Sequence, residues 1–595
     1  MHVFQRLRVS VRPAIRSTLE WLCGIRAARG RYAEVREMAQ GSVFVDKMLK
    51  SQSVVVEVSR HETIRIPRKG GCVVVSNHPL GAVDGVAMIA EMIRVRPDVK
   101  VIANEILAEV EELRPYIIPV NVLSAHVPTA NVLSMRSAFR HLESGGLLIA
   151  FPAGEVSSAH VLPPGIRDRR WSAQIAALAQ QTNATIVPAF IHARNSLLFY
   201  AVGLVHPRLR TLLLVWEMLR YTNKTIRIVI GNPMRVNDSI RAMSAGALSD
   251  VLRFRSDFLR FKNKESMVST ELRLNVGETI IQEVPAYRMM LELEKLDEGS
   301  RLVETDDFLV FTAEMRSIPC IMQEVGRLRE VTYRLIGEGS GKSCDLDVFD
   351  SMYRHVIVWH KEQSKVAGAY RIGHIDELMS RYGRNGIYTN TLFKMSDETL
   401  QTLACSLELG RSFVRPEFQR DPSVLYLLLK GIGIYVKRHP RCRYLIGPVS
   451  ISNAYTETSK RLILNSLLVH HYDRTIAKGI KPRRSLEVSL FRNWDCLLHS
   501  KTLLPISELD TLVRDAEPEG KPIPVLLKHY LSLGGKVIGF NRDALFGDCI
   551  DAFVMVDLCN ANEAALLRYF GADGMERYRN MVPMRGEQGP ESIVV

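Results

Sequence analysis

The sequence lacks any uncharged apolar run of the roughly 20 residues that a bilayer-spanning helix requires. Its nine cysteines are scattered over 595 residues and form no Cys-x-x-Cys pair, which is typical of a reduced, cytoplasmic protein. Internal repeats of about 20 to 50 residues and low-complexity tracts are also missing. These absences exclude a membrane-spanning helical protein, a disulfide scaffold and a repeat array.

The charge is unbalanced toward cations, with a formal net charge of +14. A protein of this charge should bind an anionic partner, and an anionic membrane, an acidic carrier protein and nucleic acid all have the right sign. The sequence has no zinc-finger spacing, arginine-rich repeat or ribonucleoprotein-type aromatic motif. We therefore rank nucleic acid last and expect no nucleic-acid partner.

Two segments have the composition of helices that lie on a membrane surface. Seven arginines between residues 6 and 31 alternate with apolar side chains, and apolar runs between residues 196 and 219 are interrupted by Arg208 and Arg210. Ordinary core helices show the same pattern, so both interpretations remain open. The apolar stretch 19–25 is too short for a signal peptide. Any membrane contact is therefore expected to be peripheral, on the inner face of the cell membrane.

Length and patterning predict two domains, because 595 residues exceed what one hydrophobic core usually holds. In the first domain, short β-branched runs alternate with longer helical stretches, which predicts an α/β layer fold. Strands are expected at residues 72–75, 99–103, 117–120, 147–151, 185–190 and 225–230.

The region after the last of these strands is expected to be helical and charged, over residues 238–294. The polar cluster at residues 294–300 is the expected linker. The predicted organisation is a first domain over residues 1–262, a helical connector over 263–301 and a second domain over 302–595.

The first catalytic candidates follow the apolar run Val73–Val75. Residues 76–84 read Ser-Asn-His-Pro-Leu-Gly-Ala-Val-Asp, which places His78 and Asp84 in the loop after a buried strand. An imidazole whose second nitrogen faces a carboxylate can take a proton from an attacking hydroxyl. The pattern indicates acyl transfer to an alcohol, and the alternative is a loop histidine that is satisfied internally.

This segment resembles the Asn-His-x4-Asp motif of the glycerolipid (lysophosphatidate-type) acyltransferases, although five residues separate His78 from Asp84. Gly81 could take up the extra residue through a backbone conformation that other residues avoid. Residues 151–158, Phe-Pro-Ala-Gly-Glu-Val-Ser-Ser, are similar to the family's Phe-Pro-Glu-Gly-Thr-Arg-Ser block. Residues 186–188, Ile-Val-Pro, match its Val-Pro step.

The resemblance implies an O-acyltransferase domain in which His78 is the base and Asp84 orients it. It implies further that Asn77, Gly154 and Glu155 bind substrate. Glu155 lies two positions later than the family's glutamate, so a purely structural role for it is the alternative.

Two motifs in the second half of the chain resemble known ligand-binding loops but lack the residue spacing that those loops require. Residues 337–343, Gly-Glu-Gly-Ser-Gly-Lys-Ser, lack the glycine five positions before the Gly-Lys of a phosphate-binding loop. Asp345, Asp347 and Asp350 do not have the spacing of a calcium loop. We therefore expect no bound cofactor and no metal site.

The second half resembles the N-acyltransferase domain of ornithine-lipid synthesis over residues 308–558. That family is often labelled hemolysin-like and is related to the acetyltransferase (GNAT) and acyl-homoserine-lactone synthase folds. The resemblance rests on residues 345–350, 366–373, 407–414, 447–450 and 531–537. It implies a second α/β domain of that type, and a fusion in this order resembles bifunctional ornithine-lipid or glycine-lipid synthases.

In this domain we expect Glu408 to be the base or the amine binder. Arg411 is expected to hold the carboxylate of the amino acid or the phosphate of the carrier, and Arg371 is a further candidate for the phosphate. An internal Glu408–Arg411 pair is the structural alternative. The stretch 419–424 lacks the glycines that cradle the pyrophosphate of coenzyme A. An acyl group on acyl carrier protein is therefore the expected donor, with acyl-CoA as the alternative.

The leading interpretation is a bifunctional enzyme on the membrane surface. The second domain N-acylates ornithine or glycine with a 3-hydroxyacyl group, and the first domain O-acylates the resulting hydroxyl. Acyl carrier protein, an anionic membrane surface, an amino acid and a lyso-lipid are the expected partners. A lysophospholipid acyltransferase with a non-catalytic, donor-binding second domain is one alternative, and a hemolysin-like membrane-binding protein is the other.

Overall fold

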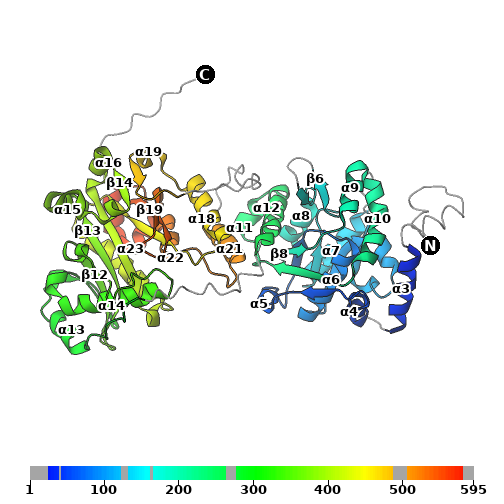
Figure 1. The fold of residues 1–595 in the computed structure, drawn as a ribbon, viewed down its shortest axis with the longest axis horizontal. Helices are drawn as coiled ribbons and strands as arrows, with labels where there is room; N and C mark the ends of the chain where they lie inside the picture. The colour runs from blue at the N-terminus through cyan, green and yellow to red at the C-terminus, as the bar shows by residue number, and fades with distance from the viewer. Residues whose placement is uncertain are drawn as a thin grey trace, which may run out of the picture. The chain divides into compact units, whose positions relative to one another are not determined.

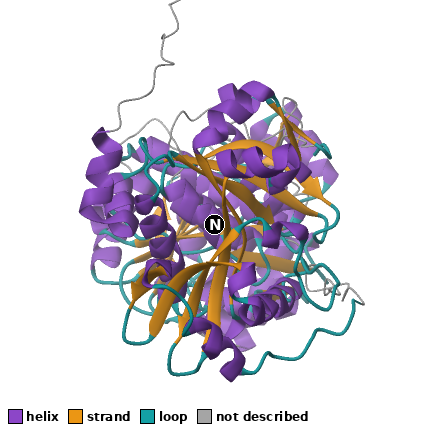
Figure 2. Ribbon diagram, turned by 90° about the vertical axis from the view of Figure 1, so that its left-hand side faces the viewer, coloured by secondary structure: helices purple, strands orange, loops and turns teal. Residues whose placement is uncertain are grey.

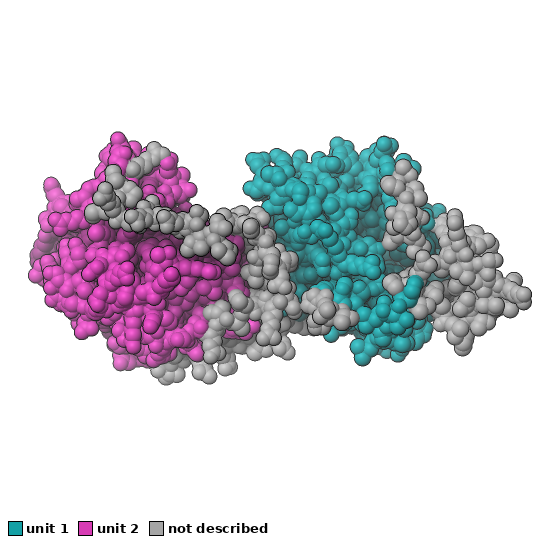
Figure 3. Space-filling model, turned by 90° about the horizontal axis from the view of Figure 1, so that it is seen from above, with its two compact units in different colours: residues 1–264, 492–501, 514–520 teal, residues 265–491, 502–513, 521–595 magenta. Residues whose placement is uncertain are grey.

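The computed structural model describes residues 25–38, 42–121, 131–160, 165–262, 277–486 and 506–580. The chain divides into two compact units, which are coloured separately in Figure 3. Unit 1 holds residues 1–264, 492–501 and 514–520, and unit 2 holds residues 265–491, 502–513 and 521–595.

Each unit has a large sheet with helices packed on it, so the chain is of the α/β class (Figures 1 and 2). The sheet of unit 1 has seven strands in the order β1-β9-β8-β2-β5-β3-β4, and every pairing is parallel except that of β8 with β9. Its elements are α3 (Ile25–Met38), α4 (Ser42–Ser51), β1 (Val55–Glu57), α5 (Arg60–Thr63), β2 (Cys72–Ser76), α6 (Ala82–Val95), β3 (Val99–Asn104), β4 (Ile117–Val120), α7 (Val132–Glu143), β5 (Leu147–Ala150), β6 (Ser158–His160), β7 (Gly165–Arg167), α8 (Ala173–Thr182), β8 (Thr185–His192), α9 (Leu197–Val205), α10 (Pro207–Arg220), β9 (Thr225–Ile230), α11 (Asp238–Ala242) and α12 (Ala245–Phe258).

The central strand β2 is buried along its whole length. Val74 belongs to one apolar cluster, whereas Val73 and Val75 belong to a second, as the alternation of side chains along a strand requires. Such a strand reads as a continuous apolar run because both faces of its sheet are covered. All six strands expected in this domain are confirmed. The carboxyl ends of β2, β5 and β8 meet at one edge, where the loops after them form the candidate site.

The sheet of unit 2 has eight strands in the order β10-β11-β12-β13-β15-β16-β19-β18. Its elements, with two small strands beside them, are α13 (Ala286–Leu293), β10 (Arg301–Glu304), β11 (Phe308–Glu314), α14 (Pro319–Arg334), β12 (Arg354–His360), β13 (Lys365–His374), α15 (Ile375–Tyr382), β14 (Phe393–Met395), α16 (Asp397–Thr402), β15 (Ser406–Val414), α17 (Pro422–Arg438), β16 (Tyr444–Ile451), α18 (Glu457–His470), α19 (Arg474–Ala477), β17 (Ile480–Pro482), α21 (Ile506–Ala516), α22 (Val525–Ser532), β18 (Lys536–Asp543), β19 (Cys549–Asp557) and α23 (Glu563–Asn580).

The two central strands of this sheet, β15 and β16, are parallel but part after a short contact. Ser406–Glu408 pair with Tyr444–Ile446, and beyond these residues β15 pairs with β13 while β16 pairs with β19. At the parting point a Cβ on Gly447 would lie 2.2 Å from the carbonyl oxygen of Leu409, so only glycine permits this approach. The result is a V-shaped opening in the middle of the sheet.

The region between the two sheets differs from the expectation. In place of the single helix expected over residues 238–294, the described residues form α11, α12 and α13. The side chains of Asn237 and Ser244 cap the beginnings of α11 and α12, and Pro285 precedes α13. Residues 277–301 belong to unit 2, and the polar cluster at 294–300 is a turn that leads into β10. Of the basic segment over residues 6–31, expected as a membrane-surface helix, residues 6–24 lie outside the described residues and residues 25–31 belong to α3.

Candidate active sites

The predicted catalytic pair is assembled in unit 1. His78 Nδ1 lies 3.1 Å from Asp84 Oδ2, and the aspartate is fully buried at the start of α6. The same oxygen accepts the backbone N–H groups of Leu80 at 2.7 Å and Gly81 at 3.1 Å. Because Nδ1 faces the carboxylate, the proton of a neutral imidazole lies on Nδ1 and Nε2 is left to accept one. Burial raises the pKa of the Asp84 carboxyl, and the His78 ring and the two N–H groups oppose that rise.

The loop glycine between His78 and Asp84 has an unusual backbone conformation. Gly81 has φ +83° and ψ −126°, which side-chain-bearing residues rarely adopt. Gly81 therefore has the kind of conformation expected of it, and its role in accommodating the longer spacing stays a prediction.

Hydrogen bonds to neighbouring strands hold the His78 loop. The amide of Asn77 accepts the N–H of Ile191 at 2.7 Å and donates to the carbonyl of Ile191 at 3.1 Å. Asn77 is buried and thus ties the loop to the end of β8, so its side chain has a positioning role in place of the predicted contact with substrate. On the other side, the N–H of Ser157 donates to the carbonyl of His78 at 2.8 Å, and the His78 ring stacks on Phe151.

The other two predicted substrate residues lie in the loop after β5. Gly154 has φ +70° and ends the turn at the open edge of the sheet. Glu155 is clamped between two arginines, with 2.6 Å to Arg169 Nε and 2.8 Å to an Nη of Arg210. Glu155 therefore lies at the mouth of the site, but its carboxylate is neutralised by these partners.

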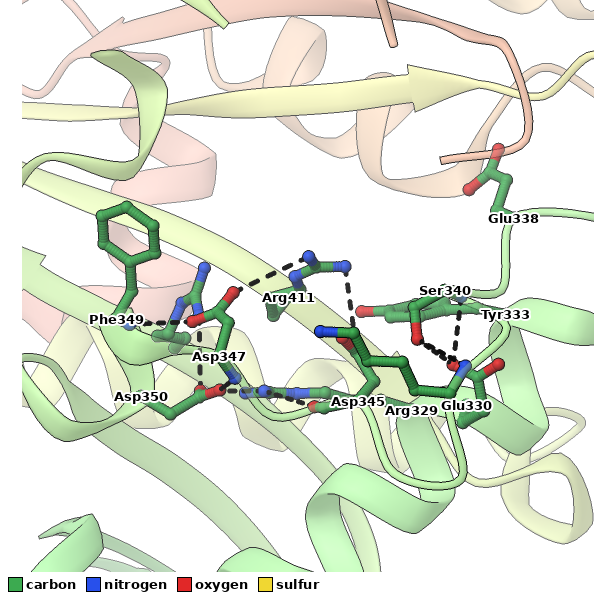
Figure 4. Close-up of polar contacts among 12 residues, drawn as sticks. Arg329, Glu330, Tyr333, Glu338, Ser340, Asp345, Asp347, Phe349, Asp350 and Arg411 are labelled. Atoms are coloured by element: carbon green, nitrogen blue, oxygen red, sulfur yellow. Dashed lines mark hydrogen bonds and ion pairs between the residues drawn. The ribbon is translucent and has the colours of Figure 1, made fainter. Parts of the chain in front are cut away.

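Unit 2 contains a buried network of arginines and aspartates, shown in Figure 4. Arg371 is fully buried and reaches Asp347 at 2.6 Å and Asp350 at 3.4 Å. Arg329 reaches Asp350 at 2.8 Å, and these cations hold the pKa of Asp350 below its usual range. Buried charges are stable only when paired in this way, so Arg371 is a structural residue of the network, in contrast to the predicted contact with substrate.

Arg411 lies at the edge of the same network, beside the V-shaped opening. Its guanidinium is 3.4 Å from Asp345 and 3.7 Å from Asp347 (Figure 4). The guanidinium also lies over the ring of Phe546. Its φ is +48°, because Arg411 and Ser412 together face the single residue Tyr370 of β13. Such a β-bulge re-aims the backbone where strand pairing is interrupted.

Glu408 has a different setting from the one expected of a base. It is 1% exposed and accepts the hydroxyl of Tyr353, the N–H of Thr389 at 2.7 Å and the N–H of Tyr388 at 3.2 Å. Three donors stabilise the carboxylate and occupy its oxygens, so the structure argues against proton abstraction by Glu408. The expected alternative, a Glu408–Arg411 pair, is also replaced, because Arg411 pairs with Asp345 and Asp347.

Glu338 is a better-placed carboxylate for the base of unit 2, and it was not among the residues predicted from the sequence. Glu338 is 2% exposed, and its carboxylate accepts a hydrogen bond from the Ser450 hydroxyl at 2.8 Å. Ser450 lies on β16, beyond the residues of β16 that pair with β15. Burial raises its pKa to about 7, and Asp551, whose pKa burial raises to about 8, lies in the same acidic group. A carboxyl that titrates near neutrality suits a base. The only sequence signal was its position in the glycine-rich stretch 337–343.

The glycine-rich stretch 337–343 already binds a carboxylate of the protein itself. The Glu330 carboxylate accepts the N–H groups of Ser340 at 3.0 Å and Gly341 at 2.9 Å, together with the Ser340 hydroxyl (Figure 4). A phosphate would compete with this buried carboxylate for the same donors.

Comparison with known proteins finds a family match in each half of the chain. Residues 41–267 match the family described as Acyltransferase, and residues 328–429 match the family described as Acetyltransferase (GNAT) domain. The two matches define a two-domain acyltransferase, and the predicted order of the domains is confirmed.

The similar curated proteins carry the two activities on separate chains. A glycine N(alpha)-acyltransferase of Bacteroides thetaiotaomicron is 31% identical over 307 residues, which cover 49% of this chain and 89% of the relative. Its counterpart in Phocaeicola vulgatus is 29% identical over 296 residues, with 47% and 88% covered. A lyso-glycine lipid O-acyltransferase of Phocaeicola vulgatus is 29% identical over 206 residues, with 33% and 69% covered. The chain belongs to the family of acyltransferases that these relatives represent. It joins an N-acyl-transfer domain and an O-acyl-transfer domain on one polypeptide.

Within the described residues, no helix is both long and apolar enough to cross a bilayer.

Proposed function

We propose that the protein makes a doubly acylated amino-acid lipid in two steps. Unit 2 transfers a 3-hydroxyacyl group to the amine of glycine or ornithine, and unit 1 then acylates the 3-hydroxyl of that product. The observation that carries the proposal is the presence on one chain of two domains whose separate relatives are a glycine N-acyltransferase and a lyso-glycine lipid O-acyltransferase.

In unit 1, His78 Nε2 takes the proton of the acceptor hydroxyl as its oxygen attacks the thioester carbon of the donor. The buried Asp84 carboxylate stabilises the imidazolium that forms, 3.1 Å from Nδ1. The C–O bond forms, the C–S bond breaks, and the imidazolium returns the proton to the leaving thiolate.

In unit 2, we assign the base to Glu338 rather than Glu408. Glu338 takes a proton from the ammonium group of the amino acid, so that the free amine attacks the thioester carbon in the opening between β15 and β16. As the C–N bond forms, the C–S bond breaks. The Glu338 carboxyl gives its proton to the leaving thiolate, and the remaining excess proton on nitrogen passes to solvent. The backbone at the Arg411–Ser412 bulge is suited to bind the oxyanion, because a bulge turns N–H groups out of the regular ladder. Arg411 stands beside the opening, where its charge attracts the carboxylate of the amino acid.

The N-terminus of α17 supports acyl carrier protein as the donor in preference to coenzyme A. Asp421 caps this helix by accepting the N–H of Ser423, and Pro422 removes another donor from the first turn. At the N-terminus of α17, the pyrophosphate of coenzyme A would therefore face the Asp421 carboxylate at the position where it requires backbone N–H donors. A groove of about 730 Å³ along α17 and α23 is lined by Lys430, Arg568 and aromatic rings, which suits the acidic surface of a carrier protein.

Helix α9 supports binding to a membrane surface. Leu197 is 86% exposed and Val205 is 80% exposed, at the two ends of an apolar helix. Asn195, just before this helix, donates its amide to the carbonyl of Pro79 at 2.9 Å. The apolar helix α9 is therefore hydrogen-bonded to the His78 loop. If α9 lies on the membrane surface, an acyl chain in the lipid that it contacts would be close to His78.

Lipid analysis of a bacterial host that expresses the chain tests the proposal. The wild type should yield a doubly acylated amino-acid lipid, and His78→Ala should yield only the mono-acylated form. Glu338→Gln should yield neither lipid, because its step comes first. The exposed residues His61 and Glu362 provide the controls His61→Ala and Glu362→Gln, which should behave as wild type. An unchanged amount of doubly acylated lipid with His78→Ala, or acylation of lysophosphatidate alone, would overturn the assignment.

A further inference from the structure

Unit 1 contains a cationic pocket beside the catalytic loop that no step described so far uses. Its volume is about 690 Å³, and its walls come from the loop after β5, the β6–β7 hairpin with the residues after it, and α12. The charged lining residues are Arg167, Arg169, Arg170, Arg253, Glu155 and Asp168. Four cations against two carboxylates make this a site for an anion.

Both acidic side chains are already committed to neighbours. Glu155 pairs with Arg169 and with Arg210, which approaches from α10. Asp168 accepts the Ser157 hydroxyl at 2.5 Å and the indole N–H of Trp171 at 3.1 Å. These contacts hold both carboxylates against the wall. Outside the lining, Arg170 lies 3.7 Å from Asp250 and Arg253 lies 3.9 Å from Asp257, so these two arginines have only long ion-pair contacts.

His160, on β6, lines the pocket beside these arginines. Its pKa is lowered, first by burial and then by the charges of Arg167, Arg253 and Arg169.

The pocket adjoins the base. Asp168 Oδ1, in its wall, is 3.4 Å from the backbone N of His78, and the N–H of the neighbouring Ser157 donates to the His78 carbonyl. An anion held here would therefore place the atoms a few bonds away from it near the imidazole.

The segment 151–158, beside this pocket, resembles the Phe-Pro-Glu-Gly-Thr-Arg-Ser block of the glycerolipid acyltransferases but lacks its arginine. Val156 stands at that position, buried in an apolar cluster with Phe199. The arginines that remain come from outside the block, on β7, the residues after it and α12. The arginines of the pocket therefore come from a different part of the chain than that block.

We propose that this arginine pocket binds the carboxylate of the amino-acid head group and so selects carboxylate-bearing lyso-lipids as acceptors of unit 1. The inference rests on the proposed function. In an N-(3-hydroxyacyl) amino acid only a few bonds separate the carboxylate from the 3-hydroxyl, which matches an anion site that adjoins His78. Planar guanidinium groups bind a carboxylate through paired N–H donors.

The test uses the purified full chain, acyl carrier protein loaded with an acyl group, and three acceptors: N-(3-hydroxyacyl)glycine, its neutral methylamide, and lysophosphatidate. The variants are Arg169→Ala, Arg169→Lys and Arg170→Ala. Arg140, exposed on α7 away from the pocket, gives the control Arg140→Ala. Arg169 is 57% exposed, so its replacement should not impair folding, and N-acyl transfer by unit 2 checks this in the same samples.

We expect the glycine acceptor to have a KM about tenfold below that of the methylamide, with a similar kcat. Arg169→Ala and Arg170→Ala should each raise the KM of the glycine acceptor severalfold to tenfold, while the KM of the methylamide stays unchanged and Arg169→Lys is intermediate. Equal KM values for the two glycine acceptors, or equal use of lysophosphatidate, would overturn the inference. Absence of O-acyl transfer to all three acceptors would instead refute the proposed function of unit 1.

Discussion

The replacement Asp84→Asn isolates the electrostatic part of the catalytic pair. Asp84 Oδ2 accepts two backbone N–H groups and faces His78 Nδ1, whereas Oδ1 has no hydrogen-bond partner among the described residues. An asparagine can keep its oxygen at the first position and place its amide at the second. Burial raises the pKa of the Asp84 carboxyl, so the fold does not favour the charge and the neutral variant should be as stable as wild type.

The rate should nevertheless fall strongly. With the ring nitrogen and carboxylate 3.1 Å apart and an effective dielectric constant of about 20, Coulomb's law gives about 5 kcal/mol between imidazolium and carboxylate. Loss of that attraction in the transition state corresponds to about 10⁴-fold in rate. This is an upper limit, because general-base catalysis as a whole contributes about 10²–10⁴. We expect a fall in O-acyl transfer of about 10²–10³, smaller than that of His78→Ala.

Single-turnover transfer from acyl carrier protein to N-(3-hydroxyacyl)glycine measures this fall. Thermal unfolding and N-acyl transfer by unit 2 are measured on the same samples and should be unchanged. If Asp84→Asn keeps more than a tenth of the wild-type rate, the carboxylate does not stabilise an imidazolium and His78 is not the base.

Four further results are expected. Because the pKa of Glu338 is raised to about 7, its ionised fraction and the N-acylation rate should rise between pH 6 and 8; Glu338→Gln should abolish that rise in a pH–rate profile. Glu408→Gln should instead lower stability by about 1–3 kcal/mol in urea unfolding and leave the pH profile of the remaining activity unaltered, which a catalytic Glu408 would contradict. Leu197→Glu on α9 should reduce sedimentation with anionic vesicles, and Arg568→Glu in the basic groove should raise the KM for acyl carrier protein about tenfold but not that for acyl-CoA. Vesicle binding equal to wild type, or equal KM changes for both donors, would refute these last two assignments.

The sequence by itself determined the layer fold of unit 1 and its catalytic pair. A strand that is buried on both faces must be apolar throughout, so the run at residues 72–75 could be recognised without tertiary information. The loop after it then carried His78 and Asp84 to the carboxyl edge of the sheet. Their distance in sequence is short, so local geometry, including the positive φ of Gly81, brings them together.

The assignments that differ in unit 2 depend on contacts between residues far apart in the chain. A sequence shows that Glu408 is a carboxylate, but not that Tyr353 and the backbone of residues 388–389 supply three donors to it. Nor does it show that Ser450, 112 residues away, is the partner of Glu338. Burial and hydrogen bonding decide whether a carboxyl is a structural anchor or a base, and both arise only when distant segments pack together. The same holds for the cationic pocket, where Arg253 of α12 lies beside Arg167, Arg169 and Arg170 from the end of β7 and the residues after it.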